Sequence, residues 1–130
     1  MEKLIGKRGL AITLIWLRSF VKTILSFFMS NRGIPKTILE IYSSNSIIDR
    51  AYLNIRWRLC PFQKIEALIP QEGLIIDIGC GYGLLSNLIA LKSHKRNVVG
   101  IDSSETRILT AQKTVKDRKN IKFLKQDIFL

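Results

Sequence analysis

The stretch "LIIDIGCGYGLL", residues 74–85, places three glycines at every second position directly behind a short apolar run. Glycine weakens ordered structure unless its missing side chain is used, because it loses more backbone freedom on folding than any other residue. The apolar run is typical of a buried strand, and the leucines that follow the glycines are typical of a helix. The stretch therefore predicts a strand, then a loop in which the missing glycine side chains have a structural or functional reason, and then a helix.

From Ser46 onward the chain alternates between helical and strand patterns. Ser46 is a candidate N-cap, and Pro70 ends the second helical pattern. The predicted elements are helices at 46–59, 62–69, 82–92 and 104–118 and strands at 74–78, 97–101 and 121–126. Strand, helix, strand, helix, strand is half of a doubly wound fold with right-handed crossovers. We therefore expect an α/β, Rossmann-like parallel sheet of three strands, sandwiched by helices.

Residues 1–45 have a different character and are predicted to be a separate, basic N-terminal helical segment. Residues 10–29 have the length of a bilayer span, but Arg18 and Lys22 in the middle would each cost about 2.5–3.5 kcal/mol there. Polar residues recurring every four positions predict a helix with one polar stripe and a broad apolar face. We favour a helix lying on a membrane surface or on a partner, with a membrane span and a secretory signal as the alternatives.

The composition excludes little by itself. The 130 residues suffice for one modest domain, and the net charge of +11 predicts attraction to anionic surfaces. Because the charge is spread along the chain, nothing beyond net charge supports nucleic acid as a partner. Cys60 and Cys80 lack the spacing of a disulfide framework or a zinc site, and no metal site is predicted. We expect a cytoplasmic protein, with a peripheral position on the inner face of a membrane as a further alternative.

The glycine loop follows the first predicted strand, at the edge where open α/β sheets bind their ligands. A dinucleotide-binding loop would read G-x-G-x-x-G. Here the third glycine, Gly83, comes one position too early, and Leu84 stands where that pattern needs glycine. A tight turn between strand and helix is the plain alternative to a ligand site.

The motif "DIGCGYG", residues 77–83, resembles the first motif of class I S-adenosylmethionine-dependent methyltransferases. The resemblance covers residues 46–130, and two further acids agree with it. Asp102 stands at the end of the second predicted strand, and Asp127 follows the third. The resemblance implies that S-adenosyl-L-methionine is the cofactor. It also implies that Asp77 contacts the methionine part, Asp102 the ribose hydroxyls, and Asp127 the adenine amino group.

The other predicted cofactor-binding positions are Gly79, Cys80, Gly81, Gly83, Ser103 and Ile128. Gly79 and Gly81 would let the cofactor approach the backbone, whereas Gly83 is open to a role in packing the helix on the sheet. We interpret Cys80 as a small packing residue rather than a nucleophile, and the resemblance places Ile128 against the adenine. Asp77 as a turn carboxylate and Asp102 as a partner for the next helix N-terminus are the structural alternatives.

The resemblance implies methyl transfer to an acceptor that the sequence does not identify. No catalytic residue is predicted, since a sulfonium methyl is already activated and holding the reactants in line contributes about 7–11 kcal/mol. His94, the single histidine, lies in a turn expected at the opposite edge of the sheet.

In the family the fold continues after the third strand with the segments that contact the acceptor. We therefore expect this chain to be the cofactor-binding half of a longer fold, and catalysis is not assigned to it alone. The apolar, basic leader favours a lipid-like or membrane-associated acceptor. The alternative function is a truncated, non-catalytic fragment, acting at most as a cofactor-binding module or as a module that attaches to a membrane or partner.

Overall fold

The computed structural model describes residues 19, 21–23, 26 and 33–127. It divides into two units, residues 1–32 and residues 33–130. The described residues of the first unit are helical, and the Thr23 hydroxyl donates to the Ser19 carbonyl at 2.9 Å. Most of the 10–29 stretch, with its three interpretations, lies outside the described residues. Within the part that is described, none of the helices is both long and apolar enough to cross a membrane.

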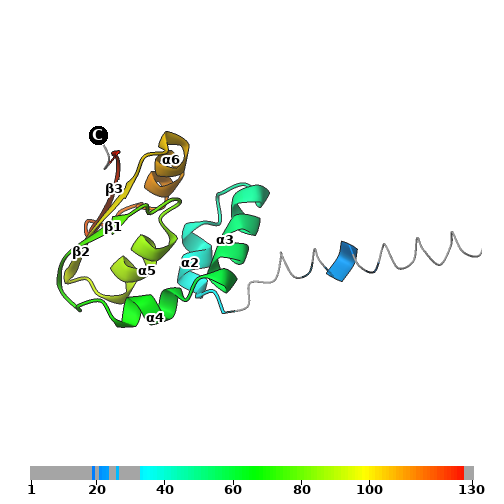
Figure 1. Cartoon of the computed structure of the whole chain (residues 1–130), viewed down its shortest axis with the longest axis horizontal. Coiled ribbons are helices and arrows are strands. Elements are labelled where there is room, and N and C mark those ends of the chain that lie inside the picture. The colour runs from blue at the N-terminus through cyan, green and yellow to red at the C-terminus, as the bar shows by residue number, and fades with distance from the viewer. Residues whose placement is uncertain (1–18, 20, 24–25, 27–32, 128–130) are drawn as a thin grey trace, which may run out of the picture. The chain divides into compact units, whose positions relative to one another are not determined.

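The second unit contains the predicted alternation of helices and strands (Figure 1). Its elements are α2 (Lys36–Ile41), α3 (Ile47–Leu59), α4 (Phe62–Ala67), β1 (Gly73–Ile78), α5 (Leu84–Lys92), β2 (Arg96–Asp102), α6 (Glu105–Lys113) and β3 (Ile121–Lys125). Ser46 caps α3 as predicted: its hydroxyl accepts from the Asp49 N–H, and the Asp49 carboxylate accepts from the Ser46 N–H. α6 ends at Lys113, earlier than predicted, and α2 was not predicted as a separate element.

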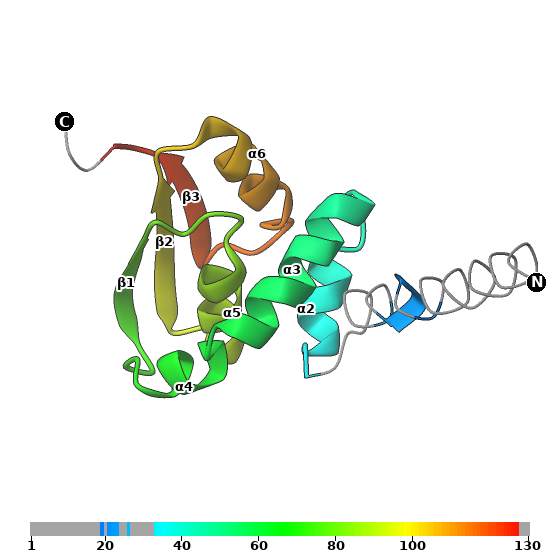
Figure 2. The ribbon, with the colours of Figure 1, turned by 45° about the vertical axis from the view of Figure 1, so that its right-hand side comes forward.

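The three strands form a parallel sheet in the order β1-β2-β3, so the Rossmann-like prediction is confirmed. The prediction of helices on both faces is wrong for the described residues, because α2 to α6 all lie on one side of the sheet (Figure 2). The strands follow one another across the sheet in chain order, and both connections between them have the same handedness. Two such connections in the same direction place α5 and α6 on the same face. The edge strand β1 accordingly leaves three large apolar side chains exposed, those of Leu74, Ile76 and Ile78.

Two apolar clusters hold the second unit together. One packs α5 and α6 against the sheet, through Ile89, Val98, Ile108 and Phe123 among others. The other joins the helices α2, α3 and α4 to α5, through Ile38, Tyr42, Leu53, Phe62 and Leu88 among others. The compact unit therefore begins at Gly33, whereas composition had placed the boundary at residue 46. Residues 33–45 belong with the sheet because α2 buries its apolar side chains on α5.

A buried ion pair closes the end of the unit opposite the glycine loop. Arg96, at the start of β2, is 0% exposed, and its Nη1 donates to the Glu66 carboxylate at 2.6 Å. The same guanidinium donates to the carbonyls of Pro70, Ile69 and Ile89 at 2.7, 2.9 and 3.2 Å. Arg96 thereby joins α4, β2 and α5 at one point.

Candidate functional site

The glycine loop, residues 79–83, leaves the end of β1 and enters α5, as predicted. Its backbone is fixed by the end of β2. The N–H groups of Gly79 and Cys80 donate to the Ile101 carbonyl at 2.8 and 3.0 Å, and the Gly81 N–H donates to Asp102 Oδ2 at 2.9 Å. The loop turns sharply because Gly79, Gly81 and Gly83 have φ angles of 75°, 55° and 80°, a region that other residues rarely adopt.

The three glycines do different things in space. A Cβ on Gly79 or Gly81 would meet no protein atom within 4 Å, so their missing side chains face open space. A Cβ on Gly83 would lie 2.5 Å from Cζ of Phe123 and 3.2 Å from Cβ of Ala111. Gly83 therefore serves the packing of α5 and α6 on β3, which was the alternative that the sequence left open.

Asp77 and Asp102 are both held by hydrogen bonds. The Ser86 hydroxyl donates to Asp77 Oδ2 at 2.5 Å. Burial raises the pKa of Asp77, and the bonds from Ser86 partly oppose that rise. Asp102 is 7% exposed and accepts the Ser104 N–H on Oδ1 at 2.8 Å, besides the Gly81 N–H on Oδ2.

Asp102 therefore binds the N-terminus of the next helix, which was the structural alternative to a cofactor contact, since Ser104 is the N-cap of α6. It does more than that, because the same carboxylate ties the glycine loop to the start of α6. A carboxylate has about four lone-pair sites, so two backbone bonds leave Asp102 able to accept hydroxyl groups as well.

Cys80 is a half-buried thiol within the loop. Burial, reinforced by the charges of Asp77 and Asp102, raises the pKa of Cys80 to about 12. Because the thiolate is the nucleophilic form, this thiol is a poor nucleophile at neutral pH, in agreement with the packing role predicted for it.

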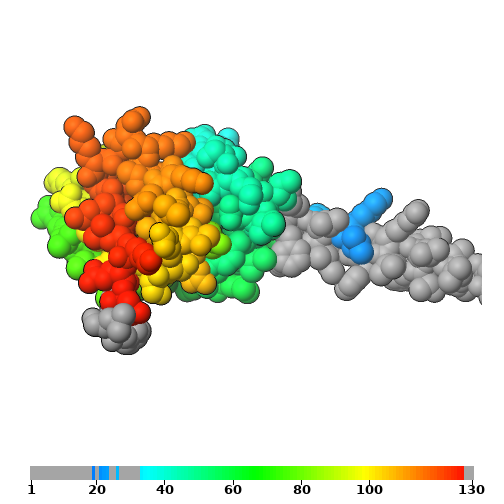
Figure 3. Space-filling model, turned by 90° about the horizontal axis from the view of Figure 1, so that it is seen from above, coloured from blue at the N-terminus to red at the C-terminus, as the bar shows by residue number. Residues whose placement is uncertain are grey.

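Two cavities flank the loop. The first has a volume of about 260 Å³ and is lined by Tyr52, Arg56, Phe62, Asp77, Gly79, Cys80, Gly81, Tyr82, Leu84, Leu85 and Arg107. The second, of about 180 Å³, is lined by Ile78, Gly79, Ile101, Asp102, Ser103, Arg107, Gln126 and Asp127. Gly79 and Arg107 line both cavities, so the two adjoin at the loop. Figure 3 views the molecule from the end at which α6 (yellow to orange) lies between β3 (red) and α3 (green).

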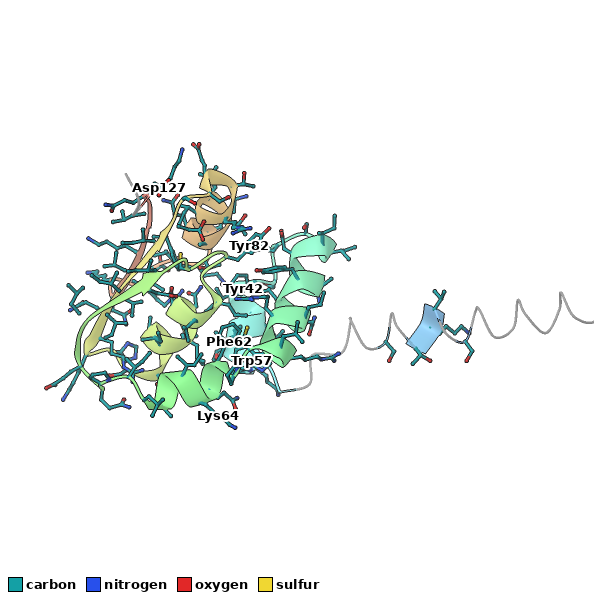
Figure 4. All side chains as sticks on the ribbon, viewed as in Figure 1. Tyr42, Trp57, Phe62, Lys64, Tyr82 and Asp127 are labelled. Atoms are coloured by element: carbon teal, nitrogen blue, oxygen red, sulfur yellow. The ribbon has the colours of Figure 1, made fainter. Side chains whose placement is uncertain are left out.

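The structure thus brings most of the predicted residues together, although on two cavities rather than one. Asp77, Cys80 and Gly81 face the first cavity, while Asp102, Ser103 and Asp127 face the second. Gly83 lines neither of the two. Ile128 lies outside the described residues. Asp127 is exposed beyond the end of β3, at the top of the sheet in Figure 4.

Sequence reasoning missed the residues that α3, α4 and α6 contribute. Tyr52 and Arg56 lie one helical turn apart on α3, and the ring of Tyr82 packs against that of Tyr52 in a tilted arrangement, with centroids 4.7 Å apart and an interplanar angle of 57°. The spacing of four residues signals that Tyr52 and Arg56 share a helix face, but it does not say where that face points. No motif in the sequence around Arg107, on α6, indicates that this residue lies at a site.

Two further predictions concern residues away from the loop. The exposed His94 lies between α5 and β2, at the end of β2 opposite Asp102, as expected. Among the residues that the structure describes, no three or more His, Cys, Asp or Glu side chains are grouped to hold a metal ion.

Comparisons with known proteins bear on the same residues. The model of the methyltransferase domain family matches residues 75–129, which include the loop and all three acids. The Bacillus subtilis (strain 168) protein named "Putative methyltransferase YqeM" is 42% identical over 64 residues, which are 49% of this chain and 25% of that protein.

Solved structures with a similar fold include two methyltransferases. The plantazolicin methyltransferase BpumL, in a complex with S-adenosylhomocysteine (SAH), has a TM-score of 0.44 and 25% identity over 71% of this chain and 38% of that one. A SAM-dependent methyltransferase from Aquifex aeolicus has a TM-score of 0.48 and 20% identity over 69% of this chain and 47% of that one. The chain thus spans a quarter of the curated relative and under half of each structure. The glycine loop and the three acids all lie within residues 75–129, and over these residues the chain is similar to the methyltransferase domain family.

Proposed function

We propose that the two cavities together bind S-adenosylmethionine and that this chain supplies the cofactor site for methyl transfer. The observation that carries the proposal is the meeting of the cavities at Gly79 and Arg107, with Asp77 on one side and Asp102 and Asp127 on the other. An elongated ligand with polar groups at both ends suits such a pair of cavities. The open space beside Gly79 and Gly81 leaves room for it against the backbone.

The residues that line the two cavities suit different ends of the ligand. Asp102 and Asp127 would accept the ribose hydroxyls and the adenine amino group in the second cavity. The amino-acid end of the cofactor carries one ammonium and one carboxylate group. Asp77 suits the ammonium, and Arg56, across the first cavity on α3, suits the carboxylate.

The residues of this chain would act by binding and orientation. Bound here, S-adenosylmethionine supplies a methyl group activated by its sulfonium sulfur. Asp102 keeps the loop and α6 together through its two backbone bonds, so both ends of the ligand meet one rigid surface. The paired rings of Tyr52 and Tyr82 line the first cavity and would shield a bound ligand from water on that side. The Cys80 thiol stays protonated and does not compete as a methyl acceptor.

Calorimetric titration with two ligands tests the proposal. SAH has both ends of the cofactor, whereas 5′-methylthioadenosine lacks the amino-acid end. We expect Asp102→Asn to weaken the binding of both ligands about tenfold, because one acceptor and the charge are lost. We expect Arg56→Gln to weaken SAH about tenfold and to leave 5′-methylthioadenosine within about twofold, because only SAH has the carboxylate.

The matched control is Arg50→Gln, which removes the same charge from the same helix at a position that lines neither cavity. It should leave both affinities unchanged. No binding of either ligand by folded wild-type protein would reject the cofactor site and favour a module that only attaches to a membrane or partner. Equal losses for both ligands in Arg56→Gln would reject the assignment of the two ends.

For the methyl acceptor we propose a lipid-like molecule at an anionic membrane surface. The net charge of +11 and the apolar face predicted for the N-terminal helix support this choice over a soluble acceptor. The chain should co-sediment with vesicles containing phosphatidylglycerol and much less with purely zwitterionic ones. Leu17→Asp with Ile24→Asp should reduce the bound fraction at least threefold, since charges on the apolar face oppose burial in lipid. Sedimentation that does not change on this double substitution would contradict the proposal.

A further inference from the structure

Tyr42 reaches the glycine loop from a part of the chain that the family model does not match. It lies directly after α2 and is 1% exposed, and its hydroxyl donates to the Tyr82 carbonyl at 2.8 Å (Figure 4). Tyr82 belongs to the loop and lines the first cavity. A hydroxyl from the buried residue that follows α2 thus holds the backbone of the loop at Tyr82.

The Tyr42 hydroxyl is itself fixed by a buried network. Asn87 Nδ2, on α5, donates to it at 2.9 Å and to the Thr114 hydroxyl at 2.9 Å. Asn87 Oδ1 accepts from Arg118 Nη2 at 2.5 Å, and that guanidinium also donates to the Thr114 carbonyl. Because the Asn87 amide occupies the acceptor side of the Tyr42 hydroxyl, the hydroxyl hydrogen is directed at the Tyr82 carbonyl. Burial also raises the pKa of Tyr42, so the hydroxyl keeps that hydrogen.

The loop needs such an anchor. Glycine at three of its five positions leaves many backbone conformations open. The bonds to Ile101 and Asp102 fix the first three residues, 79–81, but Tyr82 has no partner on β2 among the bonds described. Its carbonyl is held by Tyr42 and its ring by Tyr52, and both residues precede residue 75, where the family match begins.

We propose that Tyr42 is a positioning residue for the glycine loop, holding residues 81–83 in the conformation that binds the cofactor. The proposal rests on the proposed function for the identity of the ligand and adds residues 33–45 to the site. Tyr42 lines neither of the two cavities beside the loop and acts through the Tyr82 backbone. If Tyr42 had a purely structural role, its loss would lower the free energy of unfolding but leave the affinity of the folded protein for its ligand unchanged. The dissociation constant of the folded protein does not depend on the free energy of unfolding.

Two substitutions remove the bond in different ways. Tyr42→Phe deletes the donor and keeps the ring. Asn87→Asp keeps Tyr42 but replaces the amide donor with an acceptor, which draws the hydroxyl hydrogen away from Tyr82 while Arg118 compensates the new charge. We expect each to weaken SAH about fivefold, as one neutral hydrogen bond would. In NMR spectra of the free proteins, the Gly81 and Gly83 amide signals should broaden, and saturating SAH should sharpen them again.

The matched control is Trp57→Phe. It also removes one aromatic donor to a backbone carbonyl, that of Gly33 at 2.8 Å, without touching the loop. It should leave the SAH affinity and both glycine signals unchanged, even where it lowers stability. Affinities within twofold of wild type together with unchanged glycine signals, in both Tyr42→Phe and Asn87→Asp, would overturn the proposal. If wild-type protein binds no SAH, the proposed function fails, and the glycine signals still decide whether Tyr42 holds the loop.

Discussion

Replacing Arg96 with methionine is expected to lower the free energy of unfolding by about 3–5 kcal/mol. The Arg96 side chain is fully buried, and its loss leaves the Glu66 carboxylate, on a side chain that is 11% exposed, without its partner at 2.6 Å. Three carbonyls lose their donor at the same time, those of Ile69, Pro70 and Ile89. Urea unfolding followed by circular dichroism measures the change.

Two comparisons separate this effect from a general loss of charge. Lys125→Met breaks a pair with Glu105 whose side chains are 55% and 67% exposed, and it should cost no more than about 1 kcal/mol. Adding Glu66→Gln to Arg96→Met should restore part of the stability, since the buried charge is then gone. Equal costs for Arg96→Met and Lys125→Met would contradict the interpretation of a buried anchor.

Gly83→Ala is expected to lower the free energy of unfolding by about 2–5 kcal/mol. About 1–2 kcal/mol comes from the left-handed backbone, with φ at 80°. About 1–3 kcal/mol comes from overpacking, because the new methyl group would lie 2.5 Å from Cζ of Phe123, whose ring packs between β3 and α6. Urea midpoints and slopes of the variant and the wild type give the value.

Gly79→Ala is the natural control for Gly83→Ala. Its φ of 75° carries the same kind of backbone cost, but the added methyl group meets no protein atom within 4 Å. We expect a loss of only about 1–2 kcal/mol, with most of the effect on SAH binding. The two glycines would have the same role if both variants lost stability equally.

The local signals in the sequence proved reliable where short-range physics decides. Ser46 and Asp49 form the capping box at the start of α3, and the glycine loop begins where β1 ends. These features depend on backbone geometry within a few residues, so the residue types alone identify them. Asp102 and Asp127 follow from the same logic, because parallel strands end at one edge of a sheet.

Other features depended on contacts between distant residues. Ile38 and Tyr42 look like part of the N-terminal segment by composition, yet they are buried on α5. Arg96 begins a strand in a run of basic residues, where exposure is the normal expectation. It is buried because its guanidinium donates hydrogen bonds to the Glu66 carboxylate and to three backbone carbonyls. Tyr52 and Arg56 reach the loop because α3 shares one apolar cluster with α2, α4 and α5.

Residue types along the chain were enough to predict the order of elements from residue 46 onward, the place of the glycine loop, and the acids at the strand ends. Each of these follows from the conformational preferences of neighbouring residues. Tertiary structure decided which face of the sheet the helices cover, that α2 belongs to the sheet domain, and that Tyr42, Tyr52 and Arg56 gather around the loop. These features depend on which apolar surfaces and buried hydrogen-bonding groups from distant segments come into contact, and the sequence pattern of one segment does not indicate its partner.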